Sequence, residues 1–262
     1  MKNKGGSLSL EELKEFLDEK AELYNTPSFI EADPLSIPHR FSLKEDIEIA
    51  GFLAATIAWG NRKSIVANAN RMMHLMDDSP YDFVMEHRPN DLKRLKGFVH
   101  RTFNDVDLKY FIQALRHIYS QHGGLEQAFS TGLQHYHNLQ HSISNFKRLF
   151  FEMEHPERTR KHLSDPLSGS SAKRINMYLR WMVRQDKKGV DFGIWKSISP
   201  SALSIPLDVH TGNVSRKLGL LQRKQSDSKA VAELDEALRK MDPVDPVKYD
   251  FALFGLGAIE KF

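Results

Sequence analysis

The stretch that decides the fold runs from Pro166 to Asp208, beginning PLSGSSAKRINMYLRW (166–181) and closing with SIPLDVH (204–210). The pair Asp165-Pro166 ends any preceding helix, because proline lacks an N–H and disfavours helical geometry in the residue before it. The letters that follow predict a short turn, a basic helix, a loop and the start of a second helix.

The turn has the composition of a phosphate-binding turn. Gly169 permits a positive φ, and we expect Ser170 or Ser171 to cap the helix that follows, whose first turn contains Lys173. Exposed N–H groups in such a turn, together with the positive end of the helix dipole, suit a phosphate.

The helix after the turn has two different faces. Its apolar residues share one face at helical spacing: Ile175, Tyr178, Leu179 and Met182. On the opposite side lie Lys173, Met177, Arg180 and Arg184. We therefore expect Lys173 to point away from the local core, into a basic groove or into water. A merely solvated Lys/Arg face is the alternative interpretation.

Asp208 is the second residue of the segment LDVHTGNVSRKLGL (207–220). This segment predicts a helix that starts after Asp208 and ends at Gly219. The position predicts a helix N-cap, which contributes about 1 kcal/mol of stability with no chemistry. Neither Lys173 nor Asp208 alone therefore indicates an enzyme.

Together, three segments resemble the helix-hairpin-helix DNA glycosylase superfamily: LSGSSAK (167–173), LDVHTGNVSRKLGL (207–220) and LAATIAWGNRK (53–63). The resemblance implies that Lys173 is the lysine nucleophile and Asp208 the essential aspartate. The second segment matches further, at Val209, His210, Arg216, Leu218 and Gly219. The whole chain also resembles a bacterial family without a settled function.

The resemblance implies a two-lobed all-α fold. Residues 42–188 would form a helical barrel lobe that carries the hairpin, and residues 1–41 with 189–262 a second lobe. A flipped base would enter the cleft between them, against Trp59, Gly60 and Asn61. The residues expected to contact DNA are Gly169, Ser170, Ser171, Arg174, Arg180, Arg184 and His210.

Three features differ from the common pattern of that superfamily. Ser171 stands where the second hairpin glycine is usual. The 35-residue step from Lys173 to Asp208 is longer than in most members and is similar to the archaeal 8-oxoguanine glycosylases. The absence of cysteine excludes the iron–sulfur cluster of the endonuclease III branch.

Composition is that of an ordinary soluble globular protein, with 262 residues, 40% hydrophobic and 27% charged. No apolar run approaches the ~20 residues needed to cross a bilayer, and the lack of cysteine fits a reducing cytoplasm. Residues 147–188 hold 11 Lys and Arg against 5 Asp and Glu, a basic block of the kind that binds a phosphate backbone. We expect a cytoplasmic monomer whose partner is double-stranded DNA containing a damaged base.

Apolar periodicity predicts helices along most of the chain and no strand. Capping boxes are expected at Ser9 with Glu12 and at Ser42 with Glu45, and a cap at Ser228. The expected helices span about 10–25, 42–59, 62–76, 80–86, 105–120, 125–137, 140–153, 157–163, 173–184, 209–219, 228–241 and 246–259.

Motifs for other chemistry are weak. His135, His137 and His141 could be metal ligands, but no carboxylate accompanies them as in H-E-x-x-H, so we assign no metal site. No nucleotide-binding glycine motif is present, and we expect no cofactor.

The activity that the resemblance implies is excision of a damaged base, oxidised bases among them, followed by strand cleavage through a Schiff base on Lys173. Asp208, ionised at its helix N-terminus, would stabilise the oxocarbenium-like sugar. Lys173 would lose its proton in a desolvated cleft. Two alternatives remain open at this point: a non-catalytic DNA-binding module and a helical interaction protein. Which base is recognised is not indicated.

Overall fold

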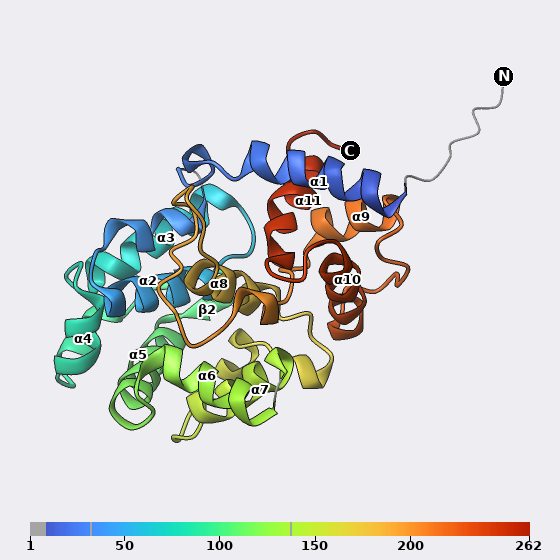
Figure 1. The fold of residues 1–262 in the computed structure, drawn as a ribbon. Coiled ribbons are helices and arrows are strands. Elements are labelled where there is room, and N and C mark those ends of the chain that lie inside the picture. Colours follow the sequence, from blue (N-terminus) through green and yellow to red (C-terminus); the bar gives the residue numbers. More distant parts are fainter. Residues whose placement is uncertain (1–8, 32, 137) are drawn as a thin grey trace.

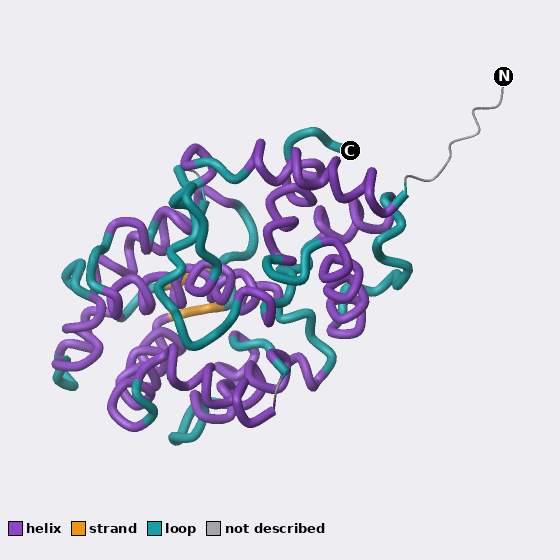
Figure 2. The backbone as a smooth tube through the Cα atoms, in the orientation of Figure 1, coloured by secondary structure: helices purple, strands orange, loops and turns teal. Residues whose placement is uncertain are grey.

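The protein is mostly helical, as expected (Figures 1 and 2). The structure, a computed structural model, describes residues 9–31, 33–136 and 138–262. The α-helices are α1 (Leu10–Tyr24), α2 (Lys44–Thr56), α3 (Arg62–Leu75), α4 (Pro80–Glu86), α5 (Asp105–Gln121), α6 (Gly124–Tyr136), α7 (Leu139–Phe150), α8 (Lys173–Val183), α9 (Val209–Lys217), α10 (Ser228–Met241) and α11 (Tyr249–Ala258).

Short 3₁₀ helices fill several connections, many of them starting at a proline, whose fixed φ suits a first helical position. They are η1 (Pro27–Phe29), η2 (Pro34–Ser36), η3 (Pro38–Arg40), η4 (Asp91–Leu95), η5 (Glu157–His162), η6 (Pro166–Ser168), η7 (Pro200–Ala202) and η8 (Pro246–Lys248).

One small hairpin was not expected from the sequence. Strands β1 (Val99–His100) and β2 (Phe103–Asn104) pair antiparallel, with His100 opposite Phe103. Arg101, in the turn between them, has a positive φ of 55°. Two residues per strand are too few to produce a recognisable alternation of polar and apolar residues.

The capping predictions had mixed outcomes. The capping box of Ser9 with Glu12 is present. The second predicted box is wrong: α2 begins after Leu43, and no side chain caps it. The prediction for α10 is wrong by one residue, because Asp227, not Ser228, accepts the N–H bonds of its first turn.

Buried apolar side chains gather in two clusters. The first draws on residues between Leu35 and Leu203, together with Val247 and Phe251. The second joins the inner face of α1 to residues between Ile205 and Leu256. Residues 189–203, which the sequence placed with the second lobe, contribute Val190, Trp195, Ile198 and Leu203 to the first cluster instead.

Helix α8 lies at the centre of the molecule and packs on α2 (Figure 1). Gly51 permits this approach, since a Cβ there would lie 3.1 Å from Met182 Cε and 3.3 Å from a ring carbon of Tyr178. At the other side, α1 packs along α11. The ring of Tyr24 occupies the space where a Cβ of Gly255 would be, so only glycine fits there.

A buried ion network connects α8 to the second cluster. Arg180 and Arg184 are only 3% and 4% exposed. Arg180 pairs with Asp191 at 3.2 Å and with Asp250 of α11, and Arg184 also pairs with Asp191 at 3.2 Å. Asp191 therefore compensates two buried guanidinium groups at once.

We predict that Asp191→Ala destabilises the protein by about 3–5 kcal/mol, because both arginines lose a partner in a site that water does not reach. Urea unfolding followed by circular dichroism measures the change in the free energy of unfolding.

Glu236→Ala is the matched control, since it removes a carboxylate from the exposed Lys240–Glu236 pair. Its unfolding midpoint should stay near that of the wild type. An Asp191→Ala protein as stable as this control would show that the network is not needed for the fold.

Candidate functional site

A cleft of about 540 Å³ opens where α8, the loop after α2 and the start of α3 face α9 and α11. Both residues that the sequence singled out for chemistry, Lys173 and Asp208, line it. Its other lining residues are Phe29, Asp33, Pro34, Ala58, Trp59, Gly60, Arg62, Ile65, Met177, Arg180, Trp181, Pro206, Val209, His210, Asp250, Phe254 and Ala258.

Lys173 is the first residue of α8, and its side chain is half-buried in this cleft. Its Nζ contacts the thioether sulfur of Met177 at 3.7 Å and forms no salt bridge with any described residue. A thioether is a weak acceptor, so the amine is not engaged by a strong partner.

The backbone in front of Lys173 is tightly turned. Gly169 has a φ of 92°, as predicted, and Ala172 has a φ of 46°, a region that is costly for a residue with a Cβ. Because the left-handed Ala172 takes the N-cap position, neither Ser170 nor Ser171 caps α8, and that prediction is wrong.

Asp208 is the N-cap of α9, as predicted. Its Oδ1 accepts the N–H of Thr211 at 2.9 Å, and no other described residue donates to this carboxylate. The side chain is half-buried and lies on the cleft. One carboxylate oxygen thus holds the helix start while the other is left for the cleft.

Two further carboxyl groups in the cleft were missed by the sequence analysis. Asp250 of α11 pairs with Arg180, and burial, aided by the negative charge of Asp208, raises its pKa to about 6 although Arg180 and Lys173 oppose the shift. Asp33 accepts the N–H of Leu35 at 3.0 Å, and burial raises its pKa as well. The available signal for Asp250 was a single acidic residue within the apolar helix YDFALFGLGA.

Of the three residues expected at the base pocket, Trp59 and Gly60 line the cleft and Asn61 does not. Asn61 is exposed and caps α3 by accepting the N–H of Ser64 at 3.2 Å. Trp59 is half-buried, and the guanidinium of Arg174 lies 4.7 Å from the centre of its ring.

The prediction that Arg180 and Arg184 contact DNA phosphates is wrong. Both guanidinium groups are buried and paired with aspartates. Arg184 pairs with Asp186, Asp191 and Asp245. Arg174 is also committed within the protein, donating to the carbonyl oxygens of Thr56 and His162. Of the eleven basic residues counted in this block, five form salt bridges with described residues: Arg158, Arg160, Arg180, Arg184 and Lys188.

The hairpin turn is less open than the sequence suggested. The N–H groups of Gly169 and Ser170 donate to Pro166 and Asp165, and that of Ala172 donates to Ser170 Oγ at 3.1 Å. These three amides are thus engaged inside the turn rather than free for phosphate. The outer side of the turn contacts the start of α10, where the Ser228 N–H donates to the Gly169 carbonyl at 3.1 Å.

Exposed cations instead stand beside the cleft. Arg62 lines it, Lys63 follows Arg62 in α3, and Arg101 is also exposed; none of them forms a salt bridge with another described residue. Arg101 lies against Gly60, since a Cβ at Gly60 would be 2.7 Å from its Nη1. His210 is exposed on the opposite wall, with its ring 6.0 Å from that of Phe254.

Two other predictions from the sequence concern membrane-spanning helices and the histidines considered as metal ligands. None of the helices in the described part of the chain is long and apolar enough to cross a bilayer. Of the three histidines in HYHNLQH, His137 lies outside the described residues.

We predict that Asp208→Asn leaves the free energy of unfolding near its wild-type value, because asparagine caps helices as well as aspartate. Asp208→Ala should cost about 1 kcal/mol, since the Thr211 N–H loses its partner. Urea unfolding of the two variants side by side measures this, and equal losses in both would contradict a capping role.

Comparison with known proteins gives one match. A family model described as "Protein of unknown function (DUF2400)" matches residues 33–259, which include every residue that lines the cleft except Phe29. Searches of curated proteins and of solved structures found no match. The chain therefore belongs to the DUF2400 family.

Proposed function

We propose that this protein is a DNA glycosylase with AP lyase activity, which acts as a cytoplasmic monomer on double-stranded DNA containing a damaged base. The observation that carries the proposal is the meeting of Lys173 and Asp208 in one cleft. They come from the starts of two helices 35 residues apart in sequence. An amine without a strong partner and a carboxylate with a free oxygen face the same space.

The cleft has the size and lining that a flipped base needs. Its volume of about 540 Å³ falls within the range of small-molecule sites. Phe29, Trp59 and Phe254 line it, and aromatic rings stack on extruded bases. Unstacking costs a few kcal/mol and least for a damaged base, which favours lesions over normal pairs.

The chemistry assigned to Lys173 is covalent. Its neutral Nζ attacks C1′ as the glycosidic bond breaks, and the base leaves with the bonding electrons and takes up a proton. Loss of the Nζ proton and opening of the sugar ring give a Schiff base. β-Elimination then breaks the C3′–O bond, and water hydrolyses the imine to free Lys173.

Asp208 stabilises the positive charge that develops on the sugar. The sugar develops oxocarbenium character as the base departs, and a nearby carboxylate stabilises that positive charge. The same carboxylate orients the Lys173 amine for attack. Asp250 lies deeper in the cleft and is held by Arg180, so we give it no part in these steps.

Arg62, Lys63 and Arg101 take over the phosphate contacts that the sequence had given to Arg180 and Arg184. All three are exposed and form no salt bridge with described acidic residues; Arg62 lines the cleft, and Arg101 lies against Gly60. DNA phosphates neutralised by such side chains release counterions, which makes affinity depend steeply on salt.

We predict that borohydride traps a covalent adduct between the wild-type protein and a duplex with an abasic site or a damaged base. Lys173→Gln and Lys173→Arg should both lose it, since a Schiff base needs a primary amine. Gel electrophoresis of the trapped complex measures the yield. Lys173→Arg keeps the charge and should retain more DNA affinity than Lys173→Gln.

Asp208→Asn provides a second variant, because it preserves the helix cap. It should bind DNA and excise the base at least ~10²-fold more slowly than the wild type. An adduct formed at the wild-type level by Lys173→Arg would assign the nucleophile to another amine. No adduct from the wild type on any lesion or abasic duplex would reject catalysis and leave a DNA-binding module.

The cations beside the cleft can be tested for phosphate contacts. Arg62→Gln and Arg101→Gln should each weaken binding to duplexes of any sequence and lower the slope of log affinity against log salt by about 1. Fluorescence anisotropy with a labelled duplex at several salt concentrations gives this slope.

Lys240→Gln is the matched control, because it removes one exposed positive charge from α10, away from the cleft. Its slope should equal that of the wild type. Identical slopes for all three variants would show that the DNA does not contact these cations.

A further inference from the structure

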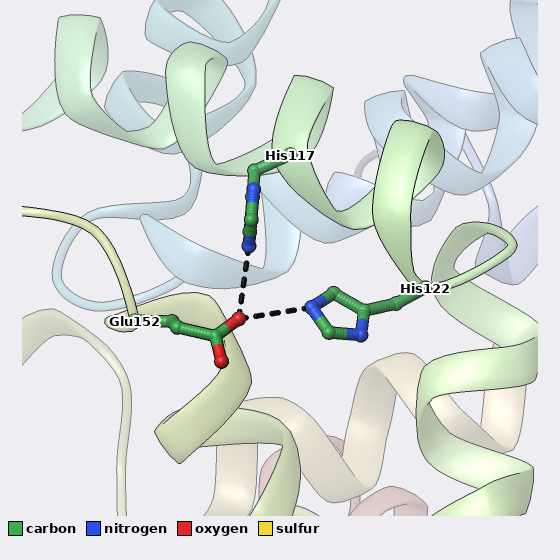
Figure 3. A group of neighbouring side chains, drawn as sticks. All are labelled: His117, His122 and Glu152. Atoms are coloured by element: carbon green, nitrogen blue, oxygen red, sulfur yellow. Dashed lines mark hydrogen bonds and ion pairs between the residues drawn. The ribbon is translucent and has the colours of Figure 1, made fainter.

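A second group of chemically active side chains lies outside the cleft, where the ends of α5 and α7 meet (Figure 3). His117 Nε2 lies 2.9 Å from Oε2 of Glu152, and His122 Nε2 lies 3.1 Å from the same oxygen. Figure 3 shows both imidazole rings directed at this one carboxylate. The three side chains thus converge on a single point.

The spacing of these atoms fits a metal ion. The three ligand atoms all lie within 4.8 Å of one another. Zinc bonds of 2.0–2.2 Å in a tetrahedral site place neighbouring ligand atoms roughly 3.3–3.6 Å apart. The histidine–glutamate distances of 2.9 and 3.1 Å are only a few tenths of an ångström shorter than that, so small side-chain shifts would admit the ion.

Backbone hydrogen bonds hold His122 and Glu152 in place, and His117 lies within α5. His122 is the C-cap of α5, with its N–H donating to the Ile118 carbonyl at 2.9 Å. Glu152 follows Phe151, the C-cap of α7, and its N–H donates to the Leu149 carbonyl at 3.2 Å. The ligands are therefore positioned by helix ends rather than by a long loop.

Solvent reaches the group. Both histidine side chains are 23% exposed and that of Glu152 is 45% exposed. His117 lines a cavity of about 580 Å³ and His122 one of about 500 Å³. None of the three residues lines the cleft that contains Lys173. An ion could enter here, and water could complete its coordination.

We propose that His117, His122 and Glu152 bind a divalent transition-metal ion of the zinc class. Two imidazoles and a carboxylate form a ligand set that zinc uses with three protein ligands and a water in the fourth position. Zinc would bind the unprotonated Nε2 of each ring, so the ring proton would lie on Nδ1 when the ion is bound. The ion ties the end of α5 to the end of α7, and this role does not depend on the proposed DNA chemistry.

No spacing in the sequence indicates this group, because Glu152 lies 30 residues after His122. The competing explanation is that Glu152 only accepts two hydrogen bonds. A metal titration separates the two, since hydrogen bonding alone gives no affinity for zinc.

The experiment is calorimetric titration of the chelator-treated full-length protein with Zn²⁺. One ion per chain should bind, and His122→Ala and Glu152→Gln should weaken binding at least 10-fold, the lower end of the loss seen even for residues that only support a ligand. Zn²⁺ should also raise the thermal midpoint of the wild type but not of the variants. Mg²⁺ should not compete, because it prefers all-oxygen sites.

His74→Ala is the matched control, since it removes an exposed histidine that pairs with one carboxylate, that of Asp78. It should bind Zn²⁺ like the wild type, and circular dichroism checks that every variant is folded. Failure of the wild type to bind Zn²⁺ overturns the proposal. So does equal affinity in the wild type, His122→Ala and Glu152→Gln, or displacement of Zn²⁺ by Mg²⁺.

Discussion

The arrangement of this molecule depends on burying the two guanidinium groups of Arg180 and Arg184 beneath the cleft. A charge removed from water is tolerated only when opposite charges and hydrogen bonds replace its hydration. Asp191 compensates both groups, and Asp250 reaches Arg180 from α11. The ring of Phe251 completes the site, 4.4 Å from the Arg180 guanidinium carbon. Helix α8 is thereby fixed to α11, and the two walls of the cleft are fixed with it.

Helix α11 has a double role because of this network. Phe251 belongs to the first apolar cluster, whereas Tyr249, Ala252, Leu253 and Leu256 belong to the second. A helix shared by both clusters leaves little freedom for one to rotate against the other. The positions of Lys173 and Asp208 in a common space follow from this shared packing, not from any contact between the two residues themselves.

Sequence reasoning located the helices well, because apolar spacing and caps such as Ser9 with Glu12 are local signals. It also predicted that Lys173 and Asp208 share a site, through a resemblance that spans three segments, and both residues line the cleft. It failed for Arg180 and Arg184 because a helical wheel shows only which face a residue shares. Their partners Asp250 and Asp245 lie 70 and 61 residues away, outside the block in which charges were counted. Asp33 and Asp250 were missed for the same reason, since burial is a property of the whole fold.

The packing of α1 along α11, with the Tyr24 ring seated over Gly255, has a consequence for biosynthesis. Among the described residues, the cluster that buries Leu13, Leu17 and Ala21 on the inner face of α1 is completed by residues between Ile205 and Leu256. At a translation rate of about 5–20 residues per second, the first helix leaves the ribosome roughly 10–50 s before the last one. The second cluster therefore closes only once α11 has been synthesised, and α1 is among the last of the described helices to be buried.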